Sequence, residues 1–208
     1  MLLSILIAAI PDRYHLAHGL LYSLLESQAV ARRPDVELLY VMDNRRRSVG
    51  AKRNALLDMA KGDYVCFIDD DDMVATDYVQ KITAAIAVGR KCVPPADVIV
   101  FPQRATIDGG VVHECTYSLD YFIQRPPETR RQLAQTPDPN VLQWTGPPAH
   151  TMAWRRGLLD GVRFEEKNFG EDTAWVDRAC EKAVSEMKIE GAPLYFYNFN
   201  SRTSATRG

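Results

Sequence analysis

The chain has 208 residues, 46% of them hydrophobic, with 25 basic and 27 acidic side chains. This length suits one compact domain with a proper core, and a formal net charge of −2 gives no general attraction to nucleic acid or anionic membranes. The four scattered cysteines form no C-x-x-C pair, which argues against a zinc or redox site and favours a reducing, cytoplasmic location. No apolar run has the length of a transmembrane segment, so we expect a protein that reaches a membrane only peripherally, through a partner.

The first half of the chain alternates two kinds of apolar pattern. Continuous apolar runs, typical of strands buried on both faces, occupy residues 3–10, 36–42 and 64–68. Helical spacing of apolar side chains occupies residues 14–32, 51–61 and 76–86, with Thr76 as a candidate cap of the third helix. This alternation predicts an α/β layered fold on a mostly parallel sheet.

The pattern is weaker after about residue 96. Apolar segments at 98–101 and 111–113 flank Asp108-Gly109-Gly110, which predicts a hairpin. Residues 124–149 are rich in Pro, Gln, Thr and Arg, and we expect a long loop of the kind that often carries a binding function. A further strand is expected at 150–154 and a helix at 172–187.

Polar clusters follow each of the three predicted strands of the first half. In chain order they are Pro11-Asp12-Arg13, Asp43-Asn44 and the four aspartates at 69–72. The carboxyl ends of parallel strands meet at one rim of the sheet, where ligands of such folds bind. Three clusters on one rim therefore predict a site there.

The run Asp69, Asp70, Asp71 and Asp72 is the strongest chemical signal in the sequence. Like charges in contact repel by about 1 kcal/mol per pair even in bulk water, and a divalent cation relieves that repulsion. Hard carboxylate oxygens suit Mg²⁺ or Mn²⁺, which would bridge two phosphates of a nucleotide and stabilise a leaving diphosphate. The plainer alternative is a solvated acidic loop that caps the next helix.

Other metal and nucleotide motifs fit poorly. An EF-hand loop starting at Asp69 would need Gly and Glu where the chain has Val74 and Gln80. A phosphatase of the haloacid-dehalogenase type places its D-x-D on the first strand, whereas two strand–helix units precede the run here. Neither a P-loop nor a G-x-G-x-x-G signature is present.

Four segments together resemble glycosyltransferase family 2, whose enzymes have the GT-A fold. They are Pro11-Asp12-Arg13 after its strand, Asp43-Asn44 after its strand, residues 48–72, and Phe169-Gly170-Glu171-Asp172. The third is the most specific, because it joins Arg53-Asn54, Gly62-Asp63-Tyr64 and the D-x-D run at the family's spacing. The resemblance implies a Rossmann-like, mostly parallel sheet flanked by helices, with a smaller antiparallel acceptor-side portion. It also implies one continuous domain, in which residues 1–95 bind the nucleotide sugar and residues 96–208 bind the acceptor and carry the base.

The resemblance implies roles for residues on the donor side. Asp43 has the position of the carboxylate that recognises nucleobase and ribose, although an Asp-Asn pair also forms ordinary turns. Lys52 and Arg53, at a helix start, are candidates for the phosphates. Asp71 is the expected metal ligand, and Asp69 is expected on the ribose or on the metal's water shell. The donor-binding set is completed by Pro11, Arg13 and Asp70.

The Glu171-Asp172 pair looks like the family's E-D motif. Asp172 would be the general base, a role that typically contributes about 10²–10⁴-fold to the rate, and Glu171 its substitute or an acceptor ligand. Either residue could instead simply cap a helix. Trp144, His150 and Trp154 lie where the acceptor should enter; packing is the simpler role for each, although aromatic faces can stack on a sugar. The C-terminal segment 195–204 resembles the aromatic strand and S-x-(S/T) tail that closes over the donor, or is an ordinary terminal strand.

The predicted function is inverting transfer of one sugar from a nucleoside-diphosphate sugar, most simply a UDP-sugar, to an acceptor hydroxyl with Mn²⁺ or Mg²⁺. A glycan or lipopolysaccharide-type acceptor is the default. Arginine pairs and runs at 45–47, 130–131 and 155–156 leave open hydroxymethylated DNA, as modified by some phage enzymes. A catalytically silent nucleotide- or carbohydrate-binding domain is the non-enzymatic alternative. A sugar nucleotidyltransferase would need a glycine-rich signature after the first strand, which Pro11-Asp12-Arg13-Tyr14 does not supply.

Overall fold

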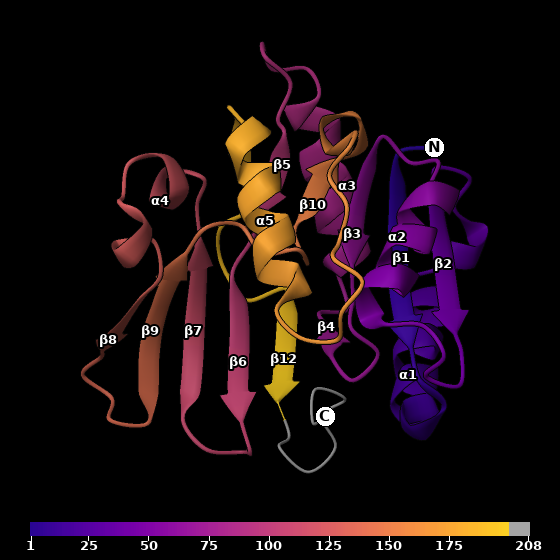
Figure 1. Ribbon diagram of the computed structural model, residues 1–208, viewed down its shortest axis with the longest axis horizontal. Helices are drawn as coiled ribbons and strands as arrows, with labels where there is room; N and C mark the ends of the chain where they lie inside the picture. The colour runs from indigo at the N-terminus through magenta and orange to yellow at the C-terminus, as the bar shows by residue number, and fades with distance from the viewer. Residues whose placement is uncertain (200–208) are drawn as a thin grey trace.

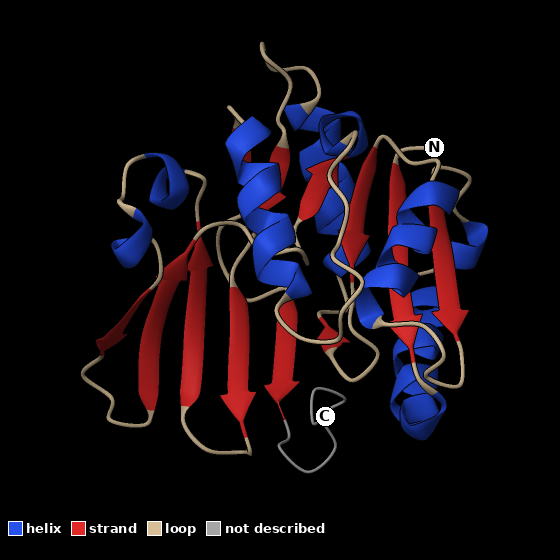
Figure 2. Cartoon of the chain, viewed as in Figure 1, coloured by secondary structure: helices blue, strands red, loops and turns tan. Residues whose placement is uncertain are grey.

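The computed structural model describes residues 1–199 and contains two six-stranded sheets that lie side by side, with helices packed around them (Figures 1 and 2). The first sheet has the order β11-β5-β10-β3-β1-β2. Its strands are β1 (Leu3–Ala9), β2 (Val36–Met42), β3 (Tyr64–Phe67), β5 (Val98–Val100), β10 (Ala153–Arg155) and β11 (Glu186–Lys188). The sheet is mostly parallel, as predicted, since only β10 runs antiparallel to its neighbours β3 and β5.

The central strand β1 sets the register of this sheet. Leu6 lies opposite Leu39 of β2 and Phe67 of β3, and both pairings are parallel. Leu3, Ile5, Leu6 and Ile7 are wholly buried, which explains why the strand is a continuous apolar run. Because β1 and β3 point the same way, the segments that follow them reach the same rim of the sheet.

The second sheet has the order β4-β12-β6-β7-β9-β8 and mixes parallel with antiparallel pairs. Its strands are β4 (Met73–Val74), β6 (Gln103–Ile107), β7 (Val112–Tyr117), β8 (Gln132–Gln135), β9 (Val141–Gly146) and β12 (Tyr195–Phe199). The strand β4 comes directly after the aspartate run, and Ala75 N donates to Leu194 O at 2.9 Å. The acidic run therefore lies at the junction of the two sheets.

Five helices and several short turns complete the described fold. The helices are α1 (Tyr14–Tyr22), α2 (Val49–Met59), α3 (Tyr78–Gly89), α4 (Asp120–Ile123) and α5 (Glu171–Lys182). Helix α1 continues as a π-helical turn (Ser23–Ser27). Four 3-10 turns occupy Pro11–Arg13, Val30–Arg32, Pro127–Thr129 and Arg156–Leu159. Ser48 caps α2, its hydroxyl accepting from Ala51 N at 3.2 Å. Gly170 precedes α5 with φ +69°, a left-handed conformation that glycine adopts readily. In Figure 1, α5 crosses in front of the region between the two sheets.

An aromatic cluster ties α5 to the first sheet. Trp175 stacks on Phe164 at 4.7 Å between ring centroids and meets the edges of Phe67 and Trp154 at 6.2 and 5.8 Å. Both tryptophans are fully buried. Since Phe67 ends β3 just before the acidic run, this packing fixes the start of α5 near that run.

Several expectations for the second half were wrong. The hairpin around residues 108–110 is formed by β6 and β7, while Val98–Val100 belongs to the first sheet. The segment 124–149 is not one long loop: it holds the 3-10 turn Pro127–Thr129 and the strands β8 and β9, whose side chains are half-buried or exposed and so give little apolar alternation.

The helix expected over residues 172–187 ends at Lys182, and residues 183–187 leave the helical path. Asp97 accepts from Val184 N at 2.9 Å and Ser185 Oγ at 3.2 Å, which directs the chain into β11. One expectation for the first half was also wrong: Thr76 is not the N-cap of α3, because Asp77 has that position.

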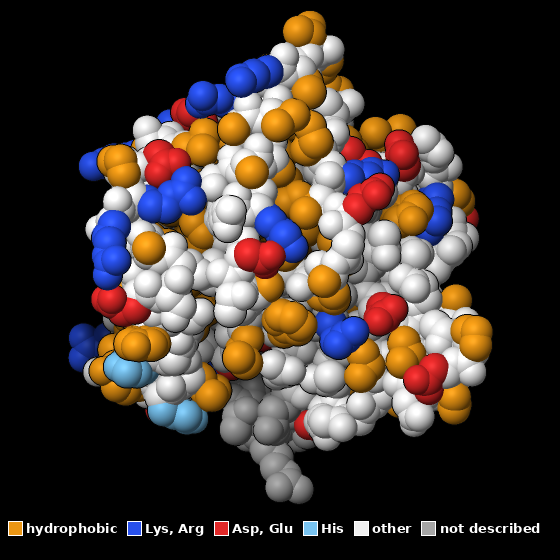
Figure 3. All heavy atoms as spheres, turned by 180° about the vertical axis from the view of Figure 1, so that it is seen from behind, with side chains coloured by type: hydrophobic (Ala, Val, Ile, Leu, Met, Phe, Trp, Pro, Cys, Tyr) orange, Lys and Arg blue, Asp and Glu red, His pale blue; other side chains and the backbone are white. Residues whose placement is uncertain are grey.

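The surface carries charges of both signs. Figure 3 shows basic and acidic side chains next to each other at several places on the back face, with further basic side chains along one edge. Within residues 1–199, no helix combines the length and the apolar character needed to cross a bilayer.

Candidate active site

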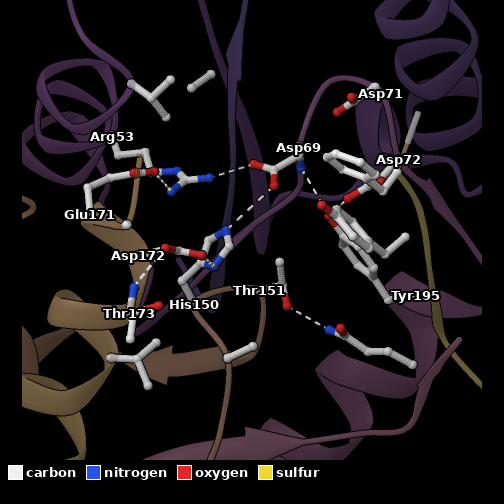
Figure 4. Close-up of a pocket in the computed structure, with 18 of the residues that line it drawn as sticks. Arg53, Asp69, Asp71, Asp72, His150, Thr151, Glu171, Asp172, Thr173 and Tyr195 are labelled. Atoms are coloured by element: carbon white, nitrogen blue, oxygen red, sulfur yellow. Dashed lines mark hydrogen bonds and ion pairs between the residues drawn. The ribbon is translucent and has the colours of Figure 1, made fainter. Parts of the chain in front are cut away.

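A pocket of about 500 Å³ lies at the carboxyl-end rim of the first sheet, where the second sheet and the start of α5 meet it. Its lining includes Arg13, Arg53, residues 69–72, Trp144, His150 and residues 168–173. The structure thus brings together the aspartate run, both members of the Glu171-Asp172 pair and Arg13, which are far apart in sequence. Figure 4 shows the acidic run on one side of this pocket and Asp172 on the other.

The four consecutive aspartates all line the pocket, but their side chains alternate between partly exposed and buried. Asp70 and Asp72 are 1% and 3% exposed, whereas the side chains of Asp69 and Asp71 are 27% and 20% exposed. Asp70 accepts from Ile10 N at 2.9 Å. Asp69 and Asp71 are therefore the two members of the run with partly exposed side chains at the pocket.

The two exposed members differ in their charge environment. Burial opposes ionisation of Asp69, but Arg53 and His150 outweigh it and hold the pKa of Asp69 below its usual range. Burial raises the pKa of Asp71, although Arg13 forms an ion pair with it. The ion pair with Arg13 thus does not fully offset the effect of burial on Asp71.

The inward-facing aspartates are held by hydrogen bonds but remain costly to ionise. Burial raises the pKa of Asp70 to about 6, even with Arg13 at 3.0 Å. Burial and the neighbouring Asp69 carboxylate raise the pKa of Asp72 well above its usual range. Tyr195 donates its hydroxyl to Asp72 at 2.6 Å and accepts from Asp69 N at 3.1 Å. The folded protein therefore resists ionisation of Asp70 and Asp72, and a cation bound beside the run would favour their charged forms.

Arg53 joins the acidic run to α5. Its guanidinium donates to Asp69 at 2.7 Å and to Glu171 at 2.6 Å, and its side chain is only 5% exposed. It also lies over the rings of Phe67 and Phe164, at 5.9 and 5.4 Å from their centroids. Burial opposes its charge, but the carboxylates of Asp69 and Glu171 raise the pKa of Arg53.

The two members of the Glu171-Asp172 pair lie in different environments. Glu171 is buried against Arg53 and has a side-chain exposure of 6%. The side chain of Asp172 is 42% exposed, lines the pocket, and accepts from Thr173 N at 2.8 Å through Oδ1. Of the two, Asp172 presents the more exposed carboxylate to the pocket.

The donor-side residues predicted from the sequence are more dispersed. Lys52 is buried, donating to Ala9 O at 3.0 Å and lying 3.5 Å from Asp43. Burial opposes ionisation of Asp43, but Arg47 and Lys52 lower its pKa. Asp43 and Pro11 lie outside the described pocket lining, and Pro11 begins a short 3-10 turn.

The acidic run fits a divalent cation whose remaining coordination positions are filled by a bound substrate and water. Among residues 1–199, no group of three or more His, Cys, Asp or Glu side chains is arranged to hold a metal by itself. Asp69 and Asp71 nevertheless offer two partly exposed carboxylates beside the buried carboxyl groups of Asp70 and Asp72. Mg²⁺ is often held in this way, by one or two carboxylates with substrate phosphates and waters.

The far wall of the pocket contains Gln103, Tyr117 and Thr151, which the sequence did not single out. Gln103 donates to Thr151 at 2.6 Å and accepts from the hydroxyl of Tyr117 at 2.9 Å. Tyr117 packs on Trp144 at 5.1 Å between ring centroids. Phe169 lies at the pocket and is 75% exposed. The aromatic residue two positions before the E-D pair was the available sequence signal for this part of the pocket.

Comparison with known proteins gives a family and a fold. The family model described as "Glycosyl transferase family 2" matches residues 26–140, just over half of the chain. No curated protein matches the sequence. A crystal structure of S. aureus TarS 1-349 in complex with UDP-GlcNAc is similar over 97% of this chain, with 18% identity and a TM-score of 0.62. The same protein in complex with UDP is similar over 96%, with 17% identity and a TM-score of 0.60. The chain spans 59% of the first of these and 61% of the second.

Proposed function

Because the chain belongs to glycosyl transferase family 2, we propose that it transfers a single sugar from a nucleoside-diphosphate sugar to an acceptor hydroxyl. The observation that carries this proposal is one pocket with Asp69 and Asp71 on one side and the exposed carboxylate of Asp172 on the other. A diphosphate needs positive charge beside it, and a hydroxyl nucleophile needs a base. The pocket offers sites for both.

The reaction we assign to this pocket is a single displacement with inversion. The acceptor oxygen attacks the anomeric carbon while Asp172 takes the hydroxyl proton. The bond between the anomeric carbon and the diphosphate oxygen breaks, and its electron pair leaves with the nucleoside diphosphate. Glu171 stays on Arg53, which supports Asp172 rather than Glu171 as the base.

On the donor side, we propose that Asp71 and Asp69 hold Mn²⁺ or Mg²⁺. When bound, the ion would neutralise charge that develops on the leaving diphosphate. Arg13 lies beside Asp71 and is the pocket cation best placed to shift toward a phosphate. Lys52 and Arg53 are engaged with Ala9 and with Asp69 and Glu171, so we assign them to shaping the donor site.

The remaining donor assignments follow the family pattern. We propose that Asp43 and Pro11 contribute to nucleoside recognition at the same rim, and that Asp70 holds the segment after β1 through Ile10 N. A UDP-sugar is the proposed donor, supported by the fold shared with a protein that was crystallised with UDP-GlcNAc. In this division, residues 1–95 supply most donor contacts and residues 96–208 supply the base and the acceptor wall.

The acceptor we propose is a neutral glycan hydroxyl. Trp144 and Phe169 offer aromatic faces of the kind that stack on sugar rings. Arginines from the basic runs are paired with acids: Arg45 with Asp12, Arg47 with Asp43, Arg131 with Asp177 and Arg155 with Asp97. This pairing leaves less positive charge for a DNA backbone, so modified DNA is the second candidate acceptor.

The free state of all four cysteines supports a cytoplasmic location.

The test is a panel of UDP-, GDP- and TDP-sugars with Mn²⁺ or Mg²⁺, scored by thermal shift and by donor hydrolysis. We expect a UDP-sugar to raise Tm only when the metal is present, and to be slowly hydrolysed. Asp172→Asn should keep the thermal shift and lose hydrolysis. Near-normal rates in Asp172→Asn would contradict the assignment of the base.

Two further outcomes separate the alternatives. A thermal shift without any turnover would support a silent binding domain, and no response to any sugar nucleotide would refute the proposed function. For the acceptor, strong weakening of binding with rising salt would favour DNA, whereas little salt dependence would favour a neutral glycan.

A further inference from the structure

His150 lies between the acidic run and the residue assigned as the base. Its Nε2 is 3.7 Å from an Asp69 carboxylate oxygen, and its Nδ1 is 3.8 Å from Asp172 Oδ2. Figure 4 shows the imidazole between these two carboxylates, with one ring nitrogen directed to each. The side chain is 10% exposed and lines the pocket.

The surroundings hold this imidazole in place but leave one of its nitrogens without a hydrogen-bond partner. The ring packs near Phe67, at 6.2 Å between centroids. On either side in sequence, Ala149 O accepts from Trp154 Nε1 at 3.0 Å, and Thr151 Oγ1 accepts from Gln103 at 2.6 Å. Within the described part of the chain, the buried Nε2 has no hydrogen-bond partner. A buried polar atom left in this way is costly, so its position calls for an explanation beyond packing.

We propose that His150 is a positioning residue that fixes the carboxylate of Asp172 relative to Asp69. This inference rests on the proposed function, because it takes Asp172 as the base. Oδ1 of Asp172 is held by Thr173 N, and Oδ2 is the oxygen that faces His150. A hydrogen bond from Nδ1 to Oδ2 would fix the carboxylate's second oxygen and so its orientation. Such contacts are often long without substrate and shorten when it binds.

The imidazole also completes a closed set of contacts across the pocket. Arg53 joins Asp69 to Glu171, and His150 lies between Asp69 and Asp172, the next residue along α5. The donor side and the first turn of α5 are therefore linked twice. Because a misplacement of about 1 Å can cost about 10²-fold in rate, the second link would matter for turnover more than for donor binding.

Three substitutions at this position separate the two nitrogens. The amide nitrogen of Asn lies close to the place of Nδ1, so His150→Asn keeps a donor toward Asp172. The amide nitrogen of Gln lies close to the place of Nε2, so His150→Gln keeps only a donor toward Asp69. His150→Ala keeps neither. His113→Ala, on β7 and outside the pocket lining, is the matched control.

The experiment measures hydrolysis of UDP-GlcNAc with Mn²⁺, giving kcat and KM separately, with Tm as the folding control. We expect His150→Ala and His150→Gln to lower kcat by about 10–100-fold, while KM for the donor changes by less than about threefold. His150→Asn should retain most of kcat, and His113→Ala should match the wild type.

Several outcomes would overturn the inference. Equal loss of kcat in the Asn, Gln and Ala variants would show a packing role, and a rise in KM with unchanged kcat would show a donor-binding role. If all three variants kept the wild-type rate, the inference alone would fail. If the wild-type protein hydrolysed no sugar nucleotide in the panel, the proposed function would fail and this inference with it.

Discussion

Replacing Arg53 with methionine should strongly destabilise the fold, because it leaves buried carboxylates without a cation. Arg53 and Glu171 have side chains only 5% and 6% exposed, and Arg53 donates to both Glu171 and Asp69 at 2.6 and 2.7 Å. Removing one partner of a buried ion pair costs about 3–5 kcal/mol. For a chain of this size, the loss corresponds to a fall in Tm of about 6–20 °C. Methionine keeps apolar contact with Phe164, so most of the loss should be electrostatic.

The measurement is urea unfolding, followed by the fluorescence of the buried residues Trp154 and Trp175. Arg163→Met is the matched control, since Arg163 makes a two-pronged pair with Asp58 on the surface. Such exposed pairs contribute about 0–1 kcal/mol. The double variant Arg53→Met with Glu171→Gln should recover part of the lost stability, because it removes one of the unpaired charges.

Two results would refute this reasoning. One is a loss in Arg53→Met that is no larger than the loss in Arg163→Met. The other is a further loss of stability when Glu171→Gln is added to Arg53→Met. Either result would mean that the carboxylates left by Arg53 become hydrated at little cost in stability. The contacts of Arg53 would then be weaker than their geometry indicates.

The remaining predictions concern the metal, a close backbone approach and the thiols. Asp71→Ala should abolish the Mn²⁺-dependent thermal shift with a UDP-sugar; a retained shift would contradict its role as ligand. Gly50→Ala should cost about 1–3 kcal/mol in urea unfolding, because its Cβ would lie 1.8 Å from Glu165 O, whereas Gly19→Ala, with open space around it in α1, should stabilise by about 0.5–1 kcal/mol. In thiol labelling, the native protein should react at the exposed Cys92, while the three buried cysteines, whose pKa values are raised by burial, react only after unfolding.

The strands of the first half could be predicted from their nearly continuous apolar runs. Burial on both faces explains this pattern for β1 and β3, whereas the edge strand β2 is mostly half-buried. The expected segments 3–10, 36–42 and 64–68 agree with β1, β2 and β3 to within one residue. The strands of the second sheet could not be found in this way. β8 is wholly exposed and β9 is half-buried, so neither needs an apolar alternation, and backbone pairing with a neighbouring strand determines their structure.

The meeting of the acidic run and the E-D pair at one pocket could also be predicted, but not the contacts within that pocket. Ligands of parallel sheets bind at the carboxyl ends of the strands, which predicted that the acidic run lies at a pocket. The family pattern predicted that the E-D pair lies at the same pocket. Lys52 at a helix start suggested a free cation, yet its amino group is bound to Ala9 O. The bridge from Arg53 to Glu171 spans 118 positions, and His150 gave no stronger signal than a packing residue. Such contacts depend on how α5 packs, which local sequence does not specify.

The backbone of the aspartate run explains why two of its four side chains are more exposed than the others. Asp70 and Asp71 lie in a turn closed by Asp72 N, which donates to Asp69 O at 3.1 Å, and this turn leaves Asp69 and Asp71 partly exposed and Asp70 and Asp72 buried. The interior pair is bound by Ile10 N and the hydroxyl of Tyr195, which fixes the backbone of the run from behind. For Asp70 or Asp72 to replace Asp69 or Asp71 as the more exposed carboxylate, this backbone would have to turn over and break both bonds. The turn therefore keeps two carboxylates partly exposed at the pocket while it anchors the residues between and after them.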